Sequence, residues 1–232
     1  MPRLKMTKAE ALQIKGVLFD LDGTLVDTAP DMIEALNISL EAHGHSRVPF
    51  EQIRDSASHG SIAMIRAALP HIDEQYIAQL QQSLFDNYER INGNDCCLFE
   101  GLDRLLETLH GLSIPYGVVT NKPARFSRPL LNRLGLTAKM PTVISGDTTL
   151  YSKPHTAPMH LAAQQLKVLP EHILYLGDAE RDLVAAKAAN MISGLALWGY
   201  IGANDDISLW PADLSFETGG HLADFFTVMQ QS

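Results

Sequence analysis

Two aspartates, Asp20 and Asp22, directly follow a short apolar run at residues 17–19. Three consecutive apolar residues predict a strand that is buried on both faces, and carboxylates at the end of such a strand contribute nothing to a hydrophobic core. Residues two apart in an extended chain project to the same side, so one carboxylate could act as a nucleophile while the other transfers protons. The alternative interpretation is a structural Asp-Gly turn at Asp22 and Gly23, which an isolated Asp-x-Asp tripeptide would favour.

Two further motifs supply groups that suit a phosphate. A second apolar run, at residues 116–119, ends in Thr120 and Asn121, whose hydroxyl and amide can donate hydrogen bonds to phosphoryl oxygens. Lys153 stands before Pro154 and ahead of a predicted helix, where its ammonium can pair with a phosphate and with a neighbouring carboxylate. Each motif alone also has a plain interpretation as a turn or a loop.

A third apolar run, at residues 173–177, ends in Asp178, and Asp182 follows four residues later. The first of these aspartates is predicted at a strand end and the second in the first turn of a helix, so both can face one cation. Carboxylate oxygens of this kind suit Mg²⁺. Gly-Asp before a helix is also an ordinary N-cap. All four motifs lie at a predicted strand end or in the loop after it, and this shared placement favours a catalytic site.

The order of these motifs resembles that of the haloacid dehalogenase-like (HAD) hydrolases. Residues 19–28 carry the first motif, the other three follow in sequence, and the resemblance extends over nearly the whole chain from about residue 14. It implies catalysis through an aspartyl-phosphate, in which Asp20 attacks phosphorus while Asp22 protonates the leaving alcohol and then activates water. Ala179 stands where the family often has a hydroxyl or another small polar residue, but this departure removes no ligand.

The resemblance also implies which groups bind the metal and the phosphoryl oxygens. The implied ligands of Mg²⁺ are Asp20, the backbone carbonyl of Asp22, and Asp178. The implied partners of the phosphoryl oxygens are Thr120, Asn121 and Lys153. Asp182 would position metal-bound waters or Lys153, and Mg²⁺ would neutralise charge on the transferring group.

Within the HAD hydrolases, the acid at Asp22 separates the classes. Dehalogenases and phosphonate hydrolases lack it, because their reactions need no such proton donor, so the resemblance implies a phosphate-monoester phosphatase. The chain most resembles phosphoglycolate phosphatase-like proteins, and residues 98–101, 118–123 and 199–201 resemble N-acetylmuramic acid 6-phosphate phosphatases. Another sugar-phosphate phosphatase and a β-phosphoglucomutase-like mutase, which uses the same acid pair, remain alternatives. A catalytically inactive binding protein on the same fold is disfavoured by the intact acids and Lys153.

The pattern between the first and second motifs differs from the rest of the chain. Apolar residues recur there at helical spacing, so residues 30–94 are predicted to form a helical insertion after the first strand. Strands and helices alternate afterwards, which predicts an α/β fold with a doubly wound parallel sheet. The expected division is a Rossmann-like HAD core at residues 1–29 and 95–232 and a cap at residues 30–94. The family resemblance identifies the insertion as a type-1 cap, which closes over the site and selects the substrate.

A polar turn between two predicted cap helices is a candidate for contact with the substrate. It consists of Ser58, His59 and Gly60. A plain interhelical turn that ends at Gly60 is equally well supported.

Composition narrows the classes of partner. The chain has 232 residues and a net charge of −9, which argues against a nucleic-acid surface but not against a small phosphorylated metabolite. No apolar run approaches the roughly 18 residues that a membrane helix requires, and residues 1–15 lack the apolar segment of a signal peptide. Adjacent Cys96 and Cys97 are best interpreted as reduced thiols. We expect a cytoplasmic protein, monomeric or homodimeric, with no nucleic-acid or membrane partner.

Overall fold

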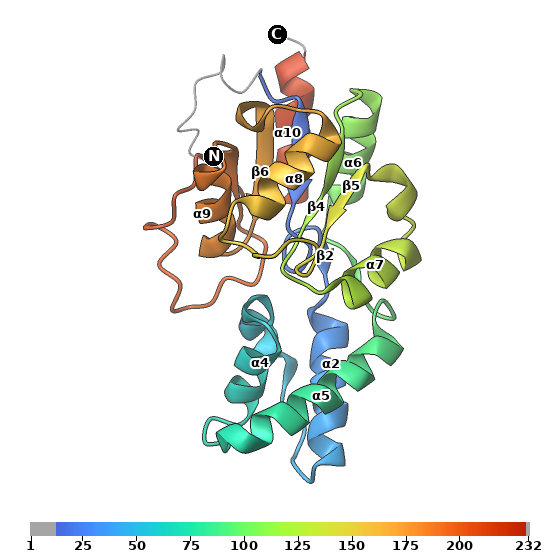
Figure 1. The fold of residues 1–232 in the computed structure, drawn as a ribbon, viewed down its shortest axis with the longest axis vertical. Coiled ribbons are helices and arrows are strands. Elements are labelled where there is room, and N and C mark those ends of the chain that lie inside the picture. The colour runs from blue at the N-terminus through green and yellow to red at the C-terminus, as the bar shows by residue number, and fades with distance from the viewer. Residues whose placement is uncertain (1–12, 231–232) are drawn as a thin grey trace.

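Six parallel strands form the sheet at the centre of the larger part of the protein (Figure 1). The structure is a computed structural model and describes residues 13–230, so most of the N-terminal segment expected to carry no signal peptide lies outside it. The spatial order is β5-β4-β1-β6-β7-β8, which places the strand that precedes Asp20 in the middle. The strands are β1 (Gly16–Phe19), β4 (Tyr116–Val119), β5 (Thr142–Ile144), β6 (Ile173–Gly177), β7 (Ile192–Ala196) and β8 (Leu214–Phe216).

Helices cover both faces of this sheet. Val17 and Phe19 belong to one hydrophobic cluster and Leu18 to another, because adjacent strand residues point to opposite faces. The first cluster is completed by α6 (Leu102–Gly111), α7 (Ala124–Arg133) and α10 (Gly219–Gln230), and the second by α8 (Ala157–Leu166) and α9 (Glu180–Ala188). This arrangement confirms the predicted α/β fold with a doubly wound parallel sheet. Its parallel strands bring their carboxyl ends to one edge, where ligands bind in such folds.

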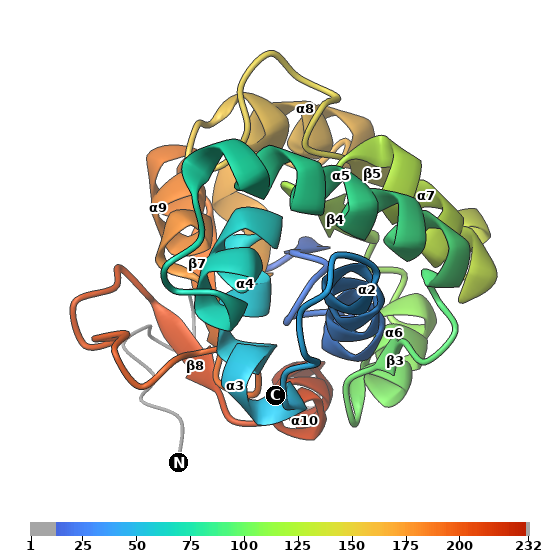
Figure 2. The same cartoon turned by 90° about the horizontal axis from the view of Figure 1, so that it is seen from below.

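A second, helical part lies at one end of the sheet (Figures 1 and 2). It contains α2 (Ala29–Ala42), α3 (Phe50–Ile53), a 3₁₀ helix (Arg54–His59), α4 (Ser61–Ala68) and α5 (Glu74–Ile91). Most of the apolar residues whose spacing predicts these helices are buried in one hydrophobic cluster, with Leu36, Leu40, Ile65 and Leu80 fully covered. Helices therefore follow the first strand as expected, and their apolar core also includes Phe126 and Tyr200 from the larger part of the protein.

The first connection between the two parts is bound by Tyr200. The connecting residues run from β2 (Val26–Asp27) into α2. The Tyr200 hydroxyl accepts the backbone amides of Thr28 and Ala29 at 2.7 and 2.8 Å and donates to Asp27 at 2.7 Å. All of these groups except Asp27 belong to buried residues. One side chain from the loop after β7 thereby fixes the start of α2.

The second connection is bound by Asp31, from the first turn of α2. Its carboxylate accepts the backbone amides of residues 93–95 at 2.6 to 3.0 Å. The buried thiol of Cys96 donates to the same carboxylate at 2.9 Å, and burial raises the pKa of this thiol, which keeps it protonated. The connection continues into β3 (Cys97–Leu98), which pairs antiparallel with β2. Both cysteines are free. Because β2 and β3 pair, the two connections lie side by side.

The sequence analysis assigned no element after residue 198, yet the structure has β8 and α10 there. The strand is only three residues long and lies at the sheet edge, so it carries little periodic signal. The last apolar run of the alternating pattern predicts a strand at residues 192–198, and this strand, β7, ends earlier, at Ala196. Within residues 13–230, we find no helix with both the length and the apolar character needed to cross a membrane.

Replacing Tyr200 by Phe removes a hydroxyl that serves three polar groups at the first connection. Buried polar groups left without a partner cost about 1–3 kcal/mol. We expect Tyr200→Phe to lower the free energy of unfolding by roughly 1–3 kcal/mol in urea denaturation. Tyr151→Phe is the matched control, because Tyr151 is 55% exposed and should change stability by less than about 0.5 kcal/mol. A Tyr200→Phe protein as stable as the control would contradict this role.

Candidate active site

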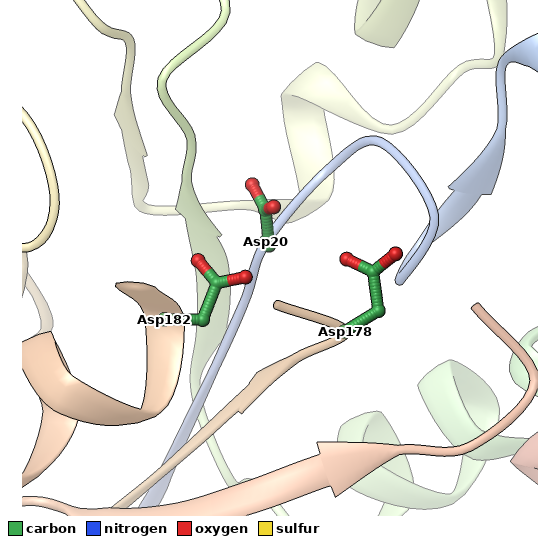
Figure 3. A group of neighbouring side chains, drawn as sticks. All are labelled: Asp20, Asp178 and Asp182. Carbon is green, nitrogen blue, oxygen red and sulfur yellow. The ribbon is translucent and has the colours of Figure 1, made fainter. Parts of the chain in front are cut away.

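Three buried carboxylates meet at the carboxyl end of the central strands (Figure 3). Asp20 follows β1, Asp178 follows β6, and Asp182 lies in the first turn of α9. Strands β1 and β6 pair in a register that aligns Phe19 with Leu176, so their ends lie side by side. One oxygen from each aspartate lies within 4.8 Å of the others. Residues 158 positions apart in sequence thus form one acidic cluster.

Lys153 places a positive charge against this cluster. Its side chain is fully buried, and its ammonium lies 2.8 Å from Asp20 Oδ1 and 2.8 Å from Asp182 Oδ1. It also donates to the carbonyl of Val119 at 2.8 Å and to the hydroxyl of Tyr175 at 2.7 Å. An ammonium has three hydrogens, so these four contacts use its whole donor capacity within the protein.

Asp178 links the acidic cluster to two other segments. Its Oδ2 accepts the hydroxyl of Ser58, from the helical part, at 2.7 Å and the amide of Tyr200 at 2.8 Å. Burial, followed by the negative charges of Asp182 and Asp20, raises the pKa of Asp178 to about 7. The two hydrogen-bond donors act in the opposite direction but are the smaller influence.

Asp22 has partners different from those of Asp20. Its Oδ1 accepts the ammonium of Lys122 at 2.7 Å and the hydroxyl of Thr28 at 2.6 Å. The next residue, Gly23, has φ +77°, and a Cβ there would lie 2.1 Å from Asp178 Oδ2. Only glycine fits this turn, which lets the backbone pass close to the acidic cluster. The two acids of the first motif are therefore held by different lysines.

Thr120 and Asn121 lie in the loop after β4. The Thr120 oxygen accepts the amide of Lys122 at 3.1 Å, which leaves the hydroxyl hydrogen for another acceptor. The Asn121 side chain exchanges two hydrogen bonds of 2.9 Å with the backbone of Lys153. One amide hydrogen of Asn121 remains for a ligand, and the side chain also joins two loops of the site.

A cavity of about 400 Å³ lies between the sheet and the helical part. The sheet side contributes Asp20, Asp22, Thr120 and Asn121, all predicted site residues. The opposite side includes the predicted polar segment Ser58, His59 and Gly60, with Ser58 buried and His59 exposed. Ser58 and His59 end the 3₁₀ helix, and Gly60 joins this helix to α4. Lys153 and Asp178 do not line the cavity but lie beside the residues that do.

Several lining residues were missed by the sequence analysis. Lys122 belongs to a motif that was noted only for its resemblance, and its ammonium lies 4.6 Å from the centre of the Tyr88 ring. Tyr88 matches the apolar spacing of α5, which predicts a core residue and not a residue of the cavity wall. Arg181 also lines the cavity, one position before Asp182. For Lys122, its place two residues after Thr120 was the available signal, whereas nothing in the sequence singles out Tyr88.

The acidic cluster has the chemistry of a divalent-cation site. Its donors are all carboxylate oxygens, which suit hard cations such as Mg²⁺. Burial and, after it, the charges of Asp182 and Asp20 raise the pKa of Asp178, so a nearby cation would favour its ionised form. The donor set and the close spacing of the three carboxylates both fit a bound divalent cation.

The sequence matches a known family and several curated proteins. The family model described as haloacid dehalogenase-like hydrolase matches residues 17–196. The phosphoglycolate phosphatase of Xanthomonas campestris pv. campestris is 39% identical over 203 residues, which cover 88% of this chain and 92% of that protein. The N-acetylmuramic acid 6-phosphate phosphatase of Pseudomonas aeruginosa is 34% identical over 214 residues, covering 92% and 95%.

Solved structures share the fold. A protein from Haemophilus somnus, described as a predicted phosphoglycolate phosphatase, superposes with a TM-score of 0.80 at 24% identity, over 91% of this chain and 97% of that one. The β-phosphoglucomutase of Clostridium difficile has a TM-score of 0.66 at 18% identity, over 94% and 100%. At these identities, the likeness concerns the fold alone.

The raised pKa of Asp178 predicts how stability depends on pH in the presence of a chelator. Between about pH 4 and pH 7, Asp178 holds a proton in the folded protein but is ionised in the unfolded chain. The folded state binds the additional proton, so its stabilising effect is lost as the pH rises to about 7. Asp178→Asn removes this titration. Relative to wild type, it should gain on the order of 1–4 kcal/mol in unfolding free energy between pH 4 and pH 8.

Chemical denaturation of both proteins across this pH range measures the difference. Glu107→Gln is the control, because Glu107 is an exposed carboxylate on α6 and should not alter the pH dependence. An unchanged difference between wild type and Asp178→Asn from pH 4 to pH 8 would refute the raised pKa.

Proposed function

The chain belongs to the haloacid dehalogenase-like hydrolase family and is a phosphoric monoester hydrolase, and we propose that it works through a phosphorylated Asp20 with Mg²⁺ bound at the acidic cluster. The observation that carries this proposal is the position of Asp20. Its carboxylate follows the central strand, contacts the Lys153 ammonium at 2.8 Å and lines the cavity. A nucleophile needs this combination of fixed orientation and access to the substrate.

Each further residue is assigned one role in this reaction. Lys153 orients Asp20 and offsets its charge, while Thr120 and Asn121 donate to the phosphoryl oxygens from the loop beside it. Asp22 protonates the leaving oxygen as the ester bond breaks and later takes a proton from the water that attacks the phosphorylated Asp20. Asp182 holds Lys153 in place through the 2.8 Å ion pair.

The cation would be held by Asp20, Asp178 and the backbone carbonyl of Asp22. When bound, it supplies positive charge to the transferring phosphoryl group. Asp182 would not bind the cation directly, because its two oxygens already accept from Lys153 and from the Ala179 amide. Asp178 must be ionised to take part, which couples metal binding to pH.

Residues 30–94 are proposed to act as a cap. Ser58, His59 and Gly60 line the cavity opposite Asp20 and Asp22, where they can contact the leaving group. The hydrogen bond from Ser58 to Asp178 joins this cap to the proposed metal site. A closed cap excludes water from the reacting phosphoryl group and selects the alcohol attached to it.

The proposed substrate is a small phosphorylated metabolite with a carboxylate on its alcohol. The relatives are named for phosphoglycolate and for N-acetylmuramic acid 6-phosphate. Both names describe the phosphate ester of a hydroxy acid. We therefore place phosphoglycolate first and the sugar acid phosphate second. A mutase is less well supported, since both curated relatives are named as phosphatases.

Asp20→Asn keeps the shape of the side chain but removes the nucleophile. We expect the release of inorganic phosphate from an aryl phosphate to fall far more than tenfold, which corresponds to more than about 1.4 kcal/mol in barrier. Circular dichroism should show an intact fold. Asp103→Asn, at an exposed position on α6, is the matched control and should retain wild-type rates. Rates for Asp20→Asn within tenfold of wild type would exclude covalent catalysis at Asp20.

Removal of divalent cations should abolish turnover, because the charge on the phosphoryl group would then lack its main counter-charge. We expect EDTA-treated protein to be inactive and MgCl₂ to restore activity. MgCl₂ should also raise the melting temperature of wild type but not that of Asp178→Ala. Glu107→Gln should respond as wild type does. Full activity after exhaustive chelation would disprove the metal requirement.

A further inference from the structure

Lys122 is a buried cation at the site for which the reaction proposed above has no role. It comes from the loop after β4, and its side chain is only 6% exposed. Its ammonium contacts Asp22 Oδ1 at 2.7 Å, the Met32 sulfur at 3.8 Å and the face of the Tyr88 ring at 4.6 Å. Asp22 is therefore its one anionic partner among the described residues, and its other neighbours belong to the cap helices.

This ion pair conflicts with the role of Asp22 as a proton donor. Both neighbours of Asp22 Oδ1, Lys122 and Thr28, present donor hydrogens to it. A carboxylate held in this way acts as an acceptor. Asp22 must therefore be released from the ammonium before it can carry a proton to the leaving oxygen.

Release of Asp22 leaves the Lys122 ammonium, which is almost fully buried, without a counter-charge. An uncompensated buried charge is strongly unfavourable. The most suitable replacement for Asp22 is another carboxylate, and it can arrive only through the cavity that both residues line. The substrate itself can supply this group.

Lys153 cannot bind the carboxylate of the substrate. Its three hydrogens are shared among four acceptors within the protein. Arg181 also lines the cavity, but its charge interacts with the acids of the cluster, namely Asp182, Asp20 and Asp178. Lys122 is the cation that lies next to the proton donor, on the side where the leaving alcohol must be.

The part of the cavity around Lys122 suits a carboxylate that is attached to an organic group. Met32, Leu84, Tyr88 and Phe126 give it an apolar surface. The Tyr88 hydroxyl is buried and has no hydrogen-bond partner among the described residues. Burial raises the pKa of Tyr88 well above its usual range, so this hydroxyl stays protonated and can donate to a bound carboxylate.

We infer that Lys122 binds a carboxylate on the leaving alcohol and, by moving to it, frees Asp22 to act as the acid. This inference rests on the proposed function. In the proposed reaction, an Asp20 oxygen bonds to phosphorus, the phosphorus–oxygen ester bond breaks with its electron pair on the alcohol oxygen, and that oxygen takes the proton that Asp22 delivers. The substrates are phosphate esters of hydroxy acids.

Matched esters with and without the carboxylate test this selection. One pair is 2-phosphoglycolate and 2-hydroxyethyl phosphate, and the other is N-acetylmuramic acid 6-phosphate and N-acetylglucosamine 6-phosphate. We expect wild type to prefer the acid in at least one pair by roughly tenfold or more in kcat/KM. Lys122→Met should lower kcat/KM for that acid by about tenfold or more, whereas kcat/KM for the neutral member should not fall, because Asp22 is then free of the ammonium.

Two controls separate recognition from folding. Lys139→Met alters an exposed lysine in the 3₁₀ helix Thr137–Lys139 and should keep the wild-type preference. Lys122→Arg keeps the charge and should retain part of the preference. Melting temperatures measured alongside report whether each variant is folded.

Equal losses on acid and neutral esters in Lys122→Met would overturn the inference, as would a wild type without preference in either pair. p-Nitrophenyl phosphate distinguishes this failure from a failure of the proposed function. Hydrolysis of p-nitrophenyl phosphate without acid preference would reject only the role of Lys122. A wild type that hydrolyses no ester in the presence of Mg²⁺ would reject both.

Discussion

Three buried carboxylates cluster at the end of the sheet around the fully buried Lys153 ammonium, and the rest of the site depends on this arrangement of charge. Lys153 pairs with Asp20 and Asp182 at 2.8 Å each. Asp178 lies within the same cluster, and its raised pKa reflects burial together with the charge of its neighbours. Buried charges are tolerated only when they are paired or bound to a metal. The site is therefore built for additional positive charge, which in this family of hydrolases a divalent metal supplies.

The fold and the cap act together to hold this cluster. Central strands in parallel register bring Asp20 and Asp178 side by side. Ser58, from the helical part, donates to the Asp178 carboxylate, and Tyr200 binds both Asp178 and the first connection to the helical part. Any movement of the helical part must therefore break or strain contacts at the acidic cluster. This arrangement links the proposed metal site, the first connection and the cavity through shared contacts.

The sequence predicted the fold well, because unbroken apolar runs mark strands buried on both faces and helical spacing marks the helical part. Asp20 and Asp178 could be placed at strand ends for the same reason. What the sequence could not show depends on contacts between distant residues. Tyr88 carries the same apolar signal whether it faces the core or the cavity. The partners of Lys122 and Tyr200 are set by tertiary packing, which no spacing rule encodes.

The central claim is that Asp20 carries the phosphoryl group, and peptide mapping after acid quench tests it most directly. Asp22→Asn should slow the hydrolysis of the phosphorylated enzyme, while p-nitrophenyl phosphate needs little help from an acid to leave. When Asp22→Asn protein is mixed with p-nitrophenyl phosphate in the presence of Mg²⁺, one phosphoryl group should appear on the peptide that contains Asp20. None should appear when Asp20 is also changed to Asn. A phosphoryl group on any other residue, or turnover of p-nitrophenyl phosphate by the doubly substituted protein at the Asp22→Asn rate, would contradict the account.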